Sequence, residues 1–539
     1  MRYLRLYPND ASFKADEINA GGTGNDVEAM VPCIVKTADL KKMYFNPHDK
    51  EILLKTITIS YKDSAGNKLA EDDVKTVKYF SGVTQEIVLT PKSIEGYVNA
   101  ENKKTISVTE DSDVVFRYYG PNHFKPLTFN IESGGIIKWC TNNTNFRKTI
   151  EYRINDGNWR SITSYTGSSV PGIYVSAGDK VEFRGNNGTY CGEINHTRVY
   201  NTFSGSSCTF SIGGNIMSLI NSEGFSGETM FTTDYTFSML FNSCTGLTSA
   251  ENLVLPVTTL TNSCYNSMFD GCTSLTTAPG LLATTLAQAC YHYMFNGCTS
   301  LLNTPELPAA TLDDGCYQGM FANCTNLEEA PNLKSVSMCE NCYKAMFNNC
   351  TSLVNAPALP ATILAESCYE YMFAGCTSLI YAHELPATNL AYECYYGMFQ
   401  GCTSLVNAPA LSATNLHGYC CMYMFANCTS LLNPPVLPAT GAAICCYNSM
   451  FKGCTSLVNA PELPALNIGS SSYDNMFEDC SNLSYIKCLA TSFSIGTPTY
   501  AWVKNVSPTG TFVKNQDMTL WTTGDNGIPS GWTVQDATS

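Results

Sequence analysis

Charged residues are scarce in this chain of 539 residues. Asp, Glu, Lys and Arg together make up 14% of it, well below the usual quarter. The surface must therefore be covered largely by neutral Asn, Ser, Thr and Tyr, which suits polar, sugar-like or protein partners. The charges that are present give a formal net charge of -15. This argues against a nucleic-acid partner, because contacts to phosphates supply most of that affinity.

Long apolar runs and catalytic motifs are missing as well. No segment is predicted to cross a membrane, and residues 1–10 lack the apolar core and cleavage site of a secretory signal. The six histidines form neither HExxH nor a Cys-His cluster, and GxSxG and GxxxxGK[ST] do not occur. We therefore predict a protein that is not an enzyme and that has no metal site and no cofactor.

The sequence does contain a repeated unit. The same Phe recurs in ten copies, with a first step of 28 residues and eight further steps of 26. These are Phe241, Phe269, Phe295, Phe321, Phe347, Phe373, Phe399, Phe425, Phe451 and Phe477. A fixed period in the twenties, with Cys, Leu and Phe at set offsets, predicts a solenoid whose neighbouring coils share one core.

Residues 283–308 show the expected structure of one unit. Cys290 and Met294 are four residues apart, and so are Tyr291 and Phe295, which predicts a short helix with a wide apolar face. The residue two after each Phe is Gly or Asn in eight copies, and both accept the left-handed conformation that ends a helix. The prolines that follow predict a short or irregular strand. The predicted fold class is therefore α+β.

The frame Phe-x-x-Cys-x-x-Leu followed by Leu-Pro extends over roughly residues 236–490. It resembles the BspA-like (Treponema pallidum-type) leucine-rich repeats of bacterial surface proteins and of proteins of phages that infect Bacteroides. The resemblance implies a solenoid of about ten 26-residue units with β-rich caps. Pro279 and its equivalents depart from the pattern because they lie in the expected strand, and a second column of cysteines is additional.

Cysteine is abundant, with 26 residues. Eighteen of them occupy two columns of the repeat, where a small buried group is needed, so we predict that most are free thiols. The adjacent pairs Cys420-Cys421 and Cys445-Cys446, in neighbouring repeats, are the better disulfide candidates.

The chain is predicted to contain five parts. These are a small β docking module at residues 1–50, a β-grasp-like module at 51–120, a β-sandwich and N-terminal cap at 121–215, the solenoid at 216–490 and a C-terminal cap at 491–539. The first part could equally be an extra β-layer of the second.

Two of these parts carry a further resemblance. Gly96-Tyr97 and the segment Val115-Phe116-Arg117-Tyr118 belong to a frame that resembles MucBP-type modules of surface proteins. Residues 1–10 resemble the amino termini of virion proteins of Bacteroides phages.

Repeat positions that vary between copies are expected to face solvent and to form the candidate ligand-binding surface. The aromatic candidates are Tyr293, Tyr371, Tyr381, Tyr396 and Tyr423. The amide candidates form one row, Asn303, Asn355, Asn407, Asn433 and Asn459. This row could instead be a structural ladder that satisfies backbone groups.

The resemblance to phage proteins and the lack of a secretory signal together predict a phage virion structural protein, a fibre or a head or tail appendage. Residues 1–50 would bind other virion proteins, and the solenoid would bind a glycan or protein on the host surface or in the gut. We expect assembly in the host cytoplasm and location in the virion, without membrane insertion. A bacterial surface adhesin at the cell surface and a capsid decoration without a receptor remain alternatives, and a homo-oligomer is left open.

Overall fold

The computed structural model describes most of the chain. The described residues are 3–9, 12–18, 52–63, 68–80, 85–94, 97–99, 103–108, 112–167, 171–205, 207–494 and 498–537. The predicted docking module at residues 1–50 therefore lies outside them, apart from the antiparallel strands β1 (Tyr3–Asn9) and β2 (Ser12–Ile18). The chain divides into two compact units, Met1–Pro121 and Asn122–Ser539.

The first unit contains a mixed sheet with the strand order β4-β3-β8-β6 and a separate pair, β5-β7. Its strands are β3 (Ile52–Asp63), β4 (Lys68–Phe80), β5 (Gln85–Leu89), β6 (Val98–Asn99), β7 (Lys104–Val108) and β8 (Ser112–Tyr119). Alternate residues of the parallel pair β3 and β8 are buried, among them Ile57, Ile59, Phe116 and Tyr118. The likeness to MucBP-type modules stays a prediction.

The second unit begins with two packed sheets, ordered β12-β11-β14-β9-β17-β18 and β13-β10-β16-β15. Their strands are β9 (Leu127–Ser133), β10 (Gly135–Thr141), β11 (Thr149–Ile154), β12 (Arg160–Thr163), β13 (Gly172–Val175), β14 (Lys180–Arg184), β15 (Cys191–Ile194), β16 (Thr197–Ser204), β17 (Thr209–Asn215) and β18 (Leu247–Val254). Phe129, Phe203 and Trp139 are buried between the sheets. The parallel pairing of β17 with β18 joins the six-stranded sheet to the first coil of the solenoid.

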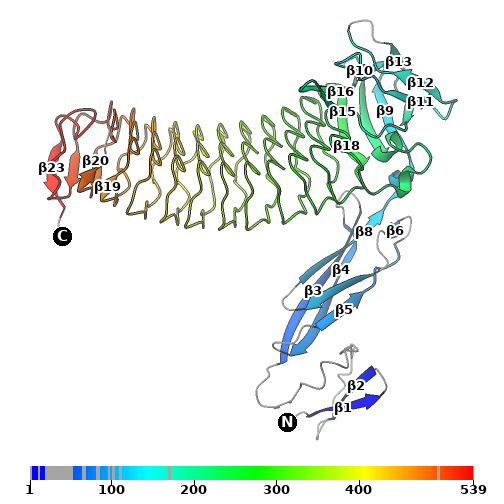
Figure 1. Ribbon diagram of the computed structural model, residues 1–539, viewed down its shortest axis with the longest axis horizontal. Helices are drawn as coiled ribbons and strands as arrows, with labels where there is room; N and C mark the ends of the chain where they lie inside the picture. Colours follow the sequence, from blue (N-terminus) through cyan, green and yellow to red (C-terminus); the bar gives the residue numbers. More distant parts are fainter. Residues whose placement is uncertain are drawn as a thin grey trace. The chain divides into compact units, whose positions relative to one another are not determined.

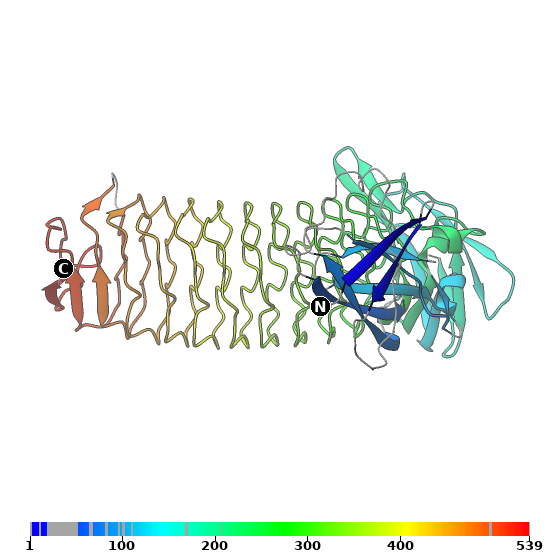
Figure 2. The same cartoon turned by 90° about the horizontal axis from the view of Figure 1, so that it is seen from below.

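The solenoid is a row of coils stacked side by side, as Figures 1 and 2 show from two directions. Coils touch through single parallel bridges, such as Asn355 to Tyr381 and Asn407 to Asn433, more often than through strands. The prolines on this side explain why: they supply no N–H group to a ladder. The expected solenoid with an irregular strand in each coil is confirmed.

The segment predicted to be a helix is a run of turns instead. Ala289, Tyr293 and Gly297 have positive φ values of 51°, 53° and 69°, so the backbone reverses every four residues. The α+β prediction is therefore wrong. The described part of the chain is strands, bridges and turns, and its only helices are three short 3₁₀ helices. These are η1 (Pro121–Phe124), η2 (Ile216–Leu219) and η3 (Phe225–Gly227).

The turns satisfy their backbone groups in two alternating ways. The N–H group of Cys290 donates to the carbonyl of Ala287 within its own coil, at 3.2 Å. The N–H group of the next residue, Tyr291, donates to the carbonyl of Cys316 in the following coil, at 3.0 Å. This alternation continues along the turn segment and from coil to coil, so the buried stack leaves few backbone donors unpaired.

Aromatic rings form two ladders through the core. Rings of consecutive ladder phenylalanines, such as Phe269 and Phe295, lie 5.4 Å apart and parallel, and the series runs unbroken from Phe241 to Phe477. A second ladder of buried tyrosines runs beside it and is interrupted where Cys421 replaces Tyr. Offset stacking of this kind adds to the area that each ring buries.

The predicted cysteine columns are buried in this core. In the column three residues after each Phe, the thiol of Cys298 donates to the carbonyl of Phe269 in the preceding coil, at 3.1 Å, and its equivalents do the same. All 25 cysteines in the described residues are free thiols. Cys420, Cys421, Cys445 and Cys446, the disulfide candidates, are among them.

The far end of the solenoid is closed by tryptophans and short strands. Trp502 lies 6.2 Å from Tyr473 and 6.1 Å from Phe477, so it covers the last members of both ladders. Trp521 stacks on Trp502 in turn, at 5.3 Å. The strands are β19 (Asn467–Ile468), β20 (Tyr485–Cys488), β21 (Ser492–Phe493), β22 (Thr511–Lys514) and β23 (Thr533–Asp536), of which β20, β22 and β23 form a parallel sheet.

Candidate binding surface

The turn segments give the solenoid one solvent-facing side, here called the turn face. Within each coil buried pairs, such as Cys290-Tyr291 and Met294-Phe295, alternate with outward pairs such as His292-Tyr293. The outward pair lies two and three residues before each ladder Phe. Because coils stack in register, the same repeat position recurs along the turn face at the spacing of one coil.

Tyr371, Tyr396 and Tyr423, three of the predicted residues, come together on three consecutive coils of the turn face. The ring of Tyr396 lies 5.2 Å from that of Tyr371 and 5.7 Å from that of Tyr423, both edge to face. All three are half-buried. Burial and a hydrogen bond that it donates to Tyr371 raise the pKa of Tyr396, so the Tyr396 hydroxyl stays protonated at ordinary pH.

Two more tyrosines lie one turn earlier in the coils of Tyr396 and Tyr423, and they were not among the residues predicted from the sequence. Tyr392 and Tyr419 lie four residues before Tyr396 and Tyr423, and their rings are 5.4 Å apart. His417 approaches Tyr392 edge to face, at 5.8 Å. Tyr392 and Tyr419 lie seven and six residues before their ladder Phe, and most other coils have other residue types at these two positions, such as Gln288 and Ala289, so no column of tyrosines predicted them. We call the five residues Tyr371, Tyr392, Tyr396, Tyr419 and Tyr423 the tyrosine patch.

The remaining predicted tyrosines lie elsewhere. Tyr293 occupies the same repeat position as Tyr371 but stands three coils away, stacked beside His292 at 4.3 Å. Its ring covers the backbone of Gly319, where a Cβ atom would lie 2.0 Å from it. Tyr381 is on another side of the solenoid, next to His383. The structure therefore does not bring these two into the tyrosine patch.

The five predicted asparagines form a row on the side that carries the bridges, here called the bridge face. All five are exposed. The side-chain amide of Asn433 donates to the carbonyl oxygen of Asn407 at 2.6 Å, so part of the row is a ladder between coils. Asn303, Asn355 and Asn459 occupy the same position along the row, and bridges join Asn355 and Asn459 to tyrosines of the next coil.

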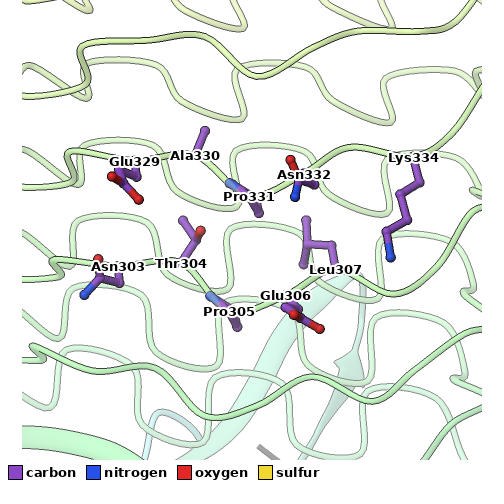
Figure 3. Close-up of a pocket in the computed structure, with 10 residues that line it drawn as sticks. All are labelled: Asn303, Thr304, Pro305, Glu306, Leu307, Glu329, Ala330, Pro331, Asn332 and Lys334. Atoms are coloured by element: carbon purple, nitrogen blue, oxygen red, sulfur yellow. The ribbon is translucent and has the colours of Figure 1, made fainter. Parts of the chain in front are cut away.

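A shallow depression lies on the bridge face between two neighbouring coils (Figure 3). One coil contributes Asn303 to Leu307, and the next contributes Glu329 to Asn332 together with Lys334. Its lining includes the apolar side chains of Pro305 and Leu307, the carboxylates of Glu306 and Glu329 and the ammonium group of Lys334. Such a rim can hydrogen-bond a polar ligand, but it presents no nucleophile beside a base.

The charge of the chain is concentrated in the solenoid. Residues 216–490 contain 19 acidic residues but only four lysines and no arginine, so they account for the whole net charge of -15. Three of the lysines form ion pairs with Glu370, Glu462 and Glu478. The remaining carboxylates give the solenoid a negative surface potential.

The described residues contain no group of three or more His, Cys, Asp or Glu side chains that could hold a metal ion. None of the helices in that part of the chain is long and apolar enough to span a membrane. The solenoid surface carries exposed rings and amides beside its excess of carboxylates. These are the features of a binding surface.

Comparison with protein families gives one match. The model of the BspA type leucine rich repeat region, in 6 copies, matches residues 237–380, 291–432 and 393–507. These overlapping stretches run from the first turn segment past Trp502 of the C-terminal cap and cover half of the chain. No curated protein and no solved structure matches the chain.

Proposed function

Because the chain belongs to the BspA type leucine-rich repeat family, whose repeats serve interaction and are not typically enzymatic, we propose that it is a non-enzymatic binding protein. The proposed contact surface is the tyrosine patch, and the proposed receptor is a glycan or protein on a cell surface. Tyrosines offer an apolar ring and a hydroxyl group in one rigid side chain, which suits both sugar rings and protein surfaces.

One observation supports the patch above other surfaces. The other tyrosine rings of the repeats are mostly core residues, as Tyr369 and Tyr395 are, at 1% exposure each. In the patch, five rings from three coils stay partly exposed and form two contacting groups, one of Tyr371, Tyr396 and Tyr423 and one of Tyr392 and Tyr419. Rings that are already packed lose little conformational entropy on binding, so a partner gains contact area at low cost.

The proposal is tested with an array of bacterial-surface and gut glycans and with fixed Bacteroides cells as probes. The full chain should bind at least one of them, and Tyr396→Ala with Tyr423→Ala should weaken that binding by tenfold or more. Tyr174→Ala, which removes a ring that is 78% exposed in the β-sandwich, is the matched control and should leave binding unchanged. Binding that the double variant retains in full would contradict the proposal.

We further propose that the chain is a virion structural protein of a Bacteroides phage, with residues 1–50 attached to the particle. The resemblance of its repeats and of its amino-terminal residues to phage virion proteins supports this. Mass spectrometry of purified virions should find the chain as a component. Its absence from virions, with recovery in an outer-membrane fraction instead, would favour the alternative of a bacterial surface adhesin.

A further inference from the structure

A stripe of exposed aliphatic side chains runs along the solenoid. Each lies seven residues after a ladder Phe, directly after a buried core Leu, and each is 36 to 54% exposed. The stripe consists of Leu302, Val354, Ile380, Val406, Leu432 and Val458. From Val354 to Val458 it occupies five consecutive coils without interruption, whereas Glu328 separates Leu302 from the rest.

On one side the stripe is bordered by a row of polar, uncharged residues. The next residue in each of the five coils is exposed and belongs to the asparagine row, with Tyr381 in place of one Asn. A row of aliphatic side chains in water is unfavourable, and a continuous one marks an interaction site more often than a random surface does. The polar rim beside an apolar centre is the usual composition of a protein interface.

The period of the stripe restricts what can cover it. Ladder rings repeat at 5.4 to 5.8 Å, so a protein partner must offer apolar groups at the same spacing over five coils. A second copy of this chain offers apolar groups at that spacing, because it carries the same stripe. Two copies can oppose the stripe in a parallel arrangement, coil against the same coil, or in an antiparallel one.

The charges beside the stripe distinguish the two arrangements. A column four residues further along the chain holds Glu384 and Glu462, with Ala358, Ala410 and Val436 between and around them. A parallel pair has its two-fold axis along the stripe, so it would place Glu328, which occupies the stripe position in its coil, against its own copy, which is unfavourable. An antiparallel pair centred on Val406 places Glu384 opposite Val436, and Glu462 opposite Ala358.

The same antiparallel arrangement matches the rest of the stripe. Val354 faces Val458, Ile380 faces Leu432, and Val406 faces itself. At the end of the stripe, Glu328 faces Ser484 of the other copy instead of a second Glu328.

We propose that the chain forms an antiparallel homodimer through this stripe, with the two-fold axis at Val406. Consecutive ladder rings of these five coils lie 5.5 to 5.8 Å apart, so the five coils span about 22 Å. A face of this length supplies roughly half of the 800 Å² or so that each partner buries in a standard interface. The dimer is therefore a weak one, with a dissociation constant of roughly 1 to 100 μM.

Sedimentation velocity of the full chain from about 1 to about 300 μM tests the proposal. The wild type should shift from monomer to dimer over this range, and Val406→Glu should stay monomeric because it places two carboxylates on the axis. Ile363→Glu is the matched control, since Ile363 is 64% exposed outside the stripe, and it should dimerise like the wild type. A wild type that stays monomeric throughout, or a control that dissociates as Val406→Glu does, would overturn the proposal.

Crosslinking determines the orientation. Val354→Cys should not crosslink to itself with a short bismaleimide, but should crosslink to Val458→Cys when the two variants are mixed. The wild type, whose described cysteines are all buried or half-buried, gives the background. Self-crosslinking of Val354→Cys above that background would show the parallel arrangement and refute the antiparallel one.

Discussion

The β-sandwich at residues 127–215 and the solenoid at residues 216–490 are parts of one compact unit, yet they are stabilised differently. The sandwich contains eight basic and six acidic residues, and its strands pair mainly antiparallel with ion pairs such as Arg184 to Glu151. The solenoid has few cations and few strands, and it repeats one set of contacts at every coil. The solenoid is therefore stabilised by contacts that repeat from coil to coil, because each turn hydrogen-bonds to the equivalent turn of the next coil.

Breaking the phenylalanine ladder should give the largest effect. Phe373→Ala removes a ring that stacks on Phe347 at 5.7 Å and on Phe399 at 5.6 Å, and should cost about 3 to 5 kcal/mol. Hydrogen exchange should show lost protection in the coils on both sides, but little change in the sandwich, because contacts in an array are between neighbours. Phe124→Ala, at a half-exposed ring, should change nothing, and a loss of protection spread evenly over residues 127–215 would count against the comparison.

A buried carboxylate gives the next largest effect. Burial alone would raise the pKa of Glu478, but hydrogen bonds from Lys452 and Lys504 outweigh it and lower the pKa to about 2. Its contribution to stability is therefore present above its ordinary pKa of 4.5 and is lost as pH falls from there toward 2. Glu478→Gln should cost about 2 kcal/mol at pH 7, and its deficit should shrink through that window in denaturant unfolding.

The matched variant in the sandwich is Glu182→Gln. Arg153 and Lys180 lower the pKa of Glu182 in the same way, against the effect of burial. A deficit for Glu478→Gln that is constant from pH 7 to pH 2 would contradict the assignment.

His292 gives a smaller effect of the opposite chemical kind. Burial, helped by the charge of Arg198, lowers its pKa to about 4. In the unfolded chain His292 binds a proton near pH 6.5, whereas in the folded chain it stays neutral down to about pH 4. The free energy of unfolding should therefore fall as pH drops from about 6.5 to 4. His292→Gln should remove most of that fall. An unchanged slope in thermal unfolding against pH would show that the side chain titrates normally.

The smallest effect concerns the left-handed turn positions. Ala345 has a φ of 52°, which strains a residue with a Cβ atom, so Ala345→Gly should stabilise the solenoid by up to about 1 kcal/mol. Gly375→Ala is the opposite test, because its Cβ atom would lie 2.2 Å from Oδ1 of Asn349, and it should destabilise. Equal midpoints for both variants in urea would contradict the assigned backbone.

Much of the solenoid could be predicted from the sequence, because period and core columns are properties of residue type alone. The helix could not be separated from turns in this way, since periods of 3.6 and 4 residues bury the same positions over a segment as short as Cys290 to Met294. Turns differ from a helix in having a residue with positive φ at every fourth position, such as Gly315, Gly319 and Asn323. Gly and Asn adopt that conformation readily. Of these three residues, only Asn323 lies at the position that predicted a helix end.

The candidate site was predicted in part. The exposure of the asparagine row and the position of Tyr371, Tyr396 and Tyr423 follow from their repeat positions. Tyr392 and Tyr419 contact each other across neighbouring coils, and a single column does not reveal such a contact. The aliphatic stripe could also be predicted from the sequence. In an extended segment successive side chains point to opposite sides, so an apolar residue directly after a buried Leu faces away from the core.

Circular dichroism of the full chain in the far ultraviolet tests the central structural claim most directly. Stacked turns and short strands should give a spectrum without the paired minima of an α-helix, both in the folded protein and through its unfolding transition. A clear helical spectrum, with the content that ten short helices would supply, would contradict the turn-built coils and every surface argued from them.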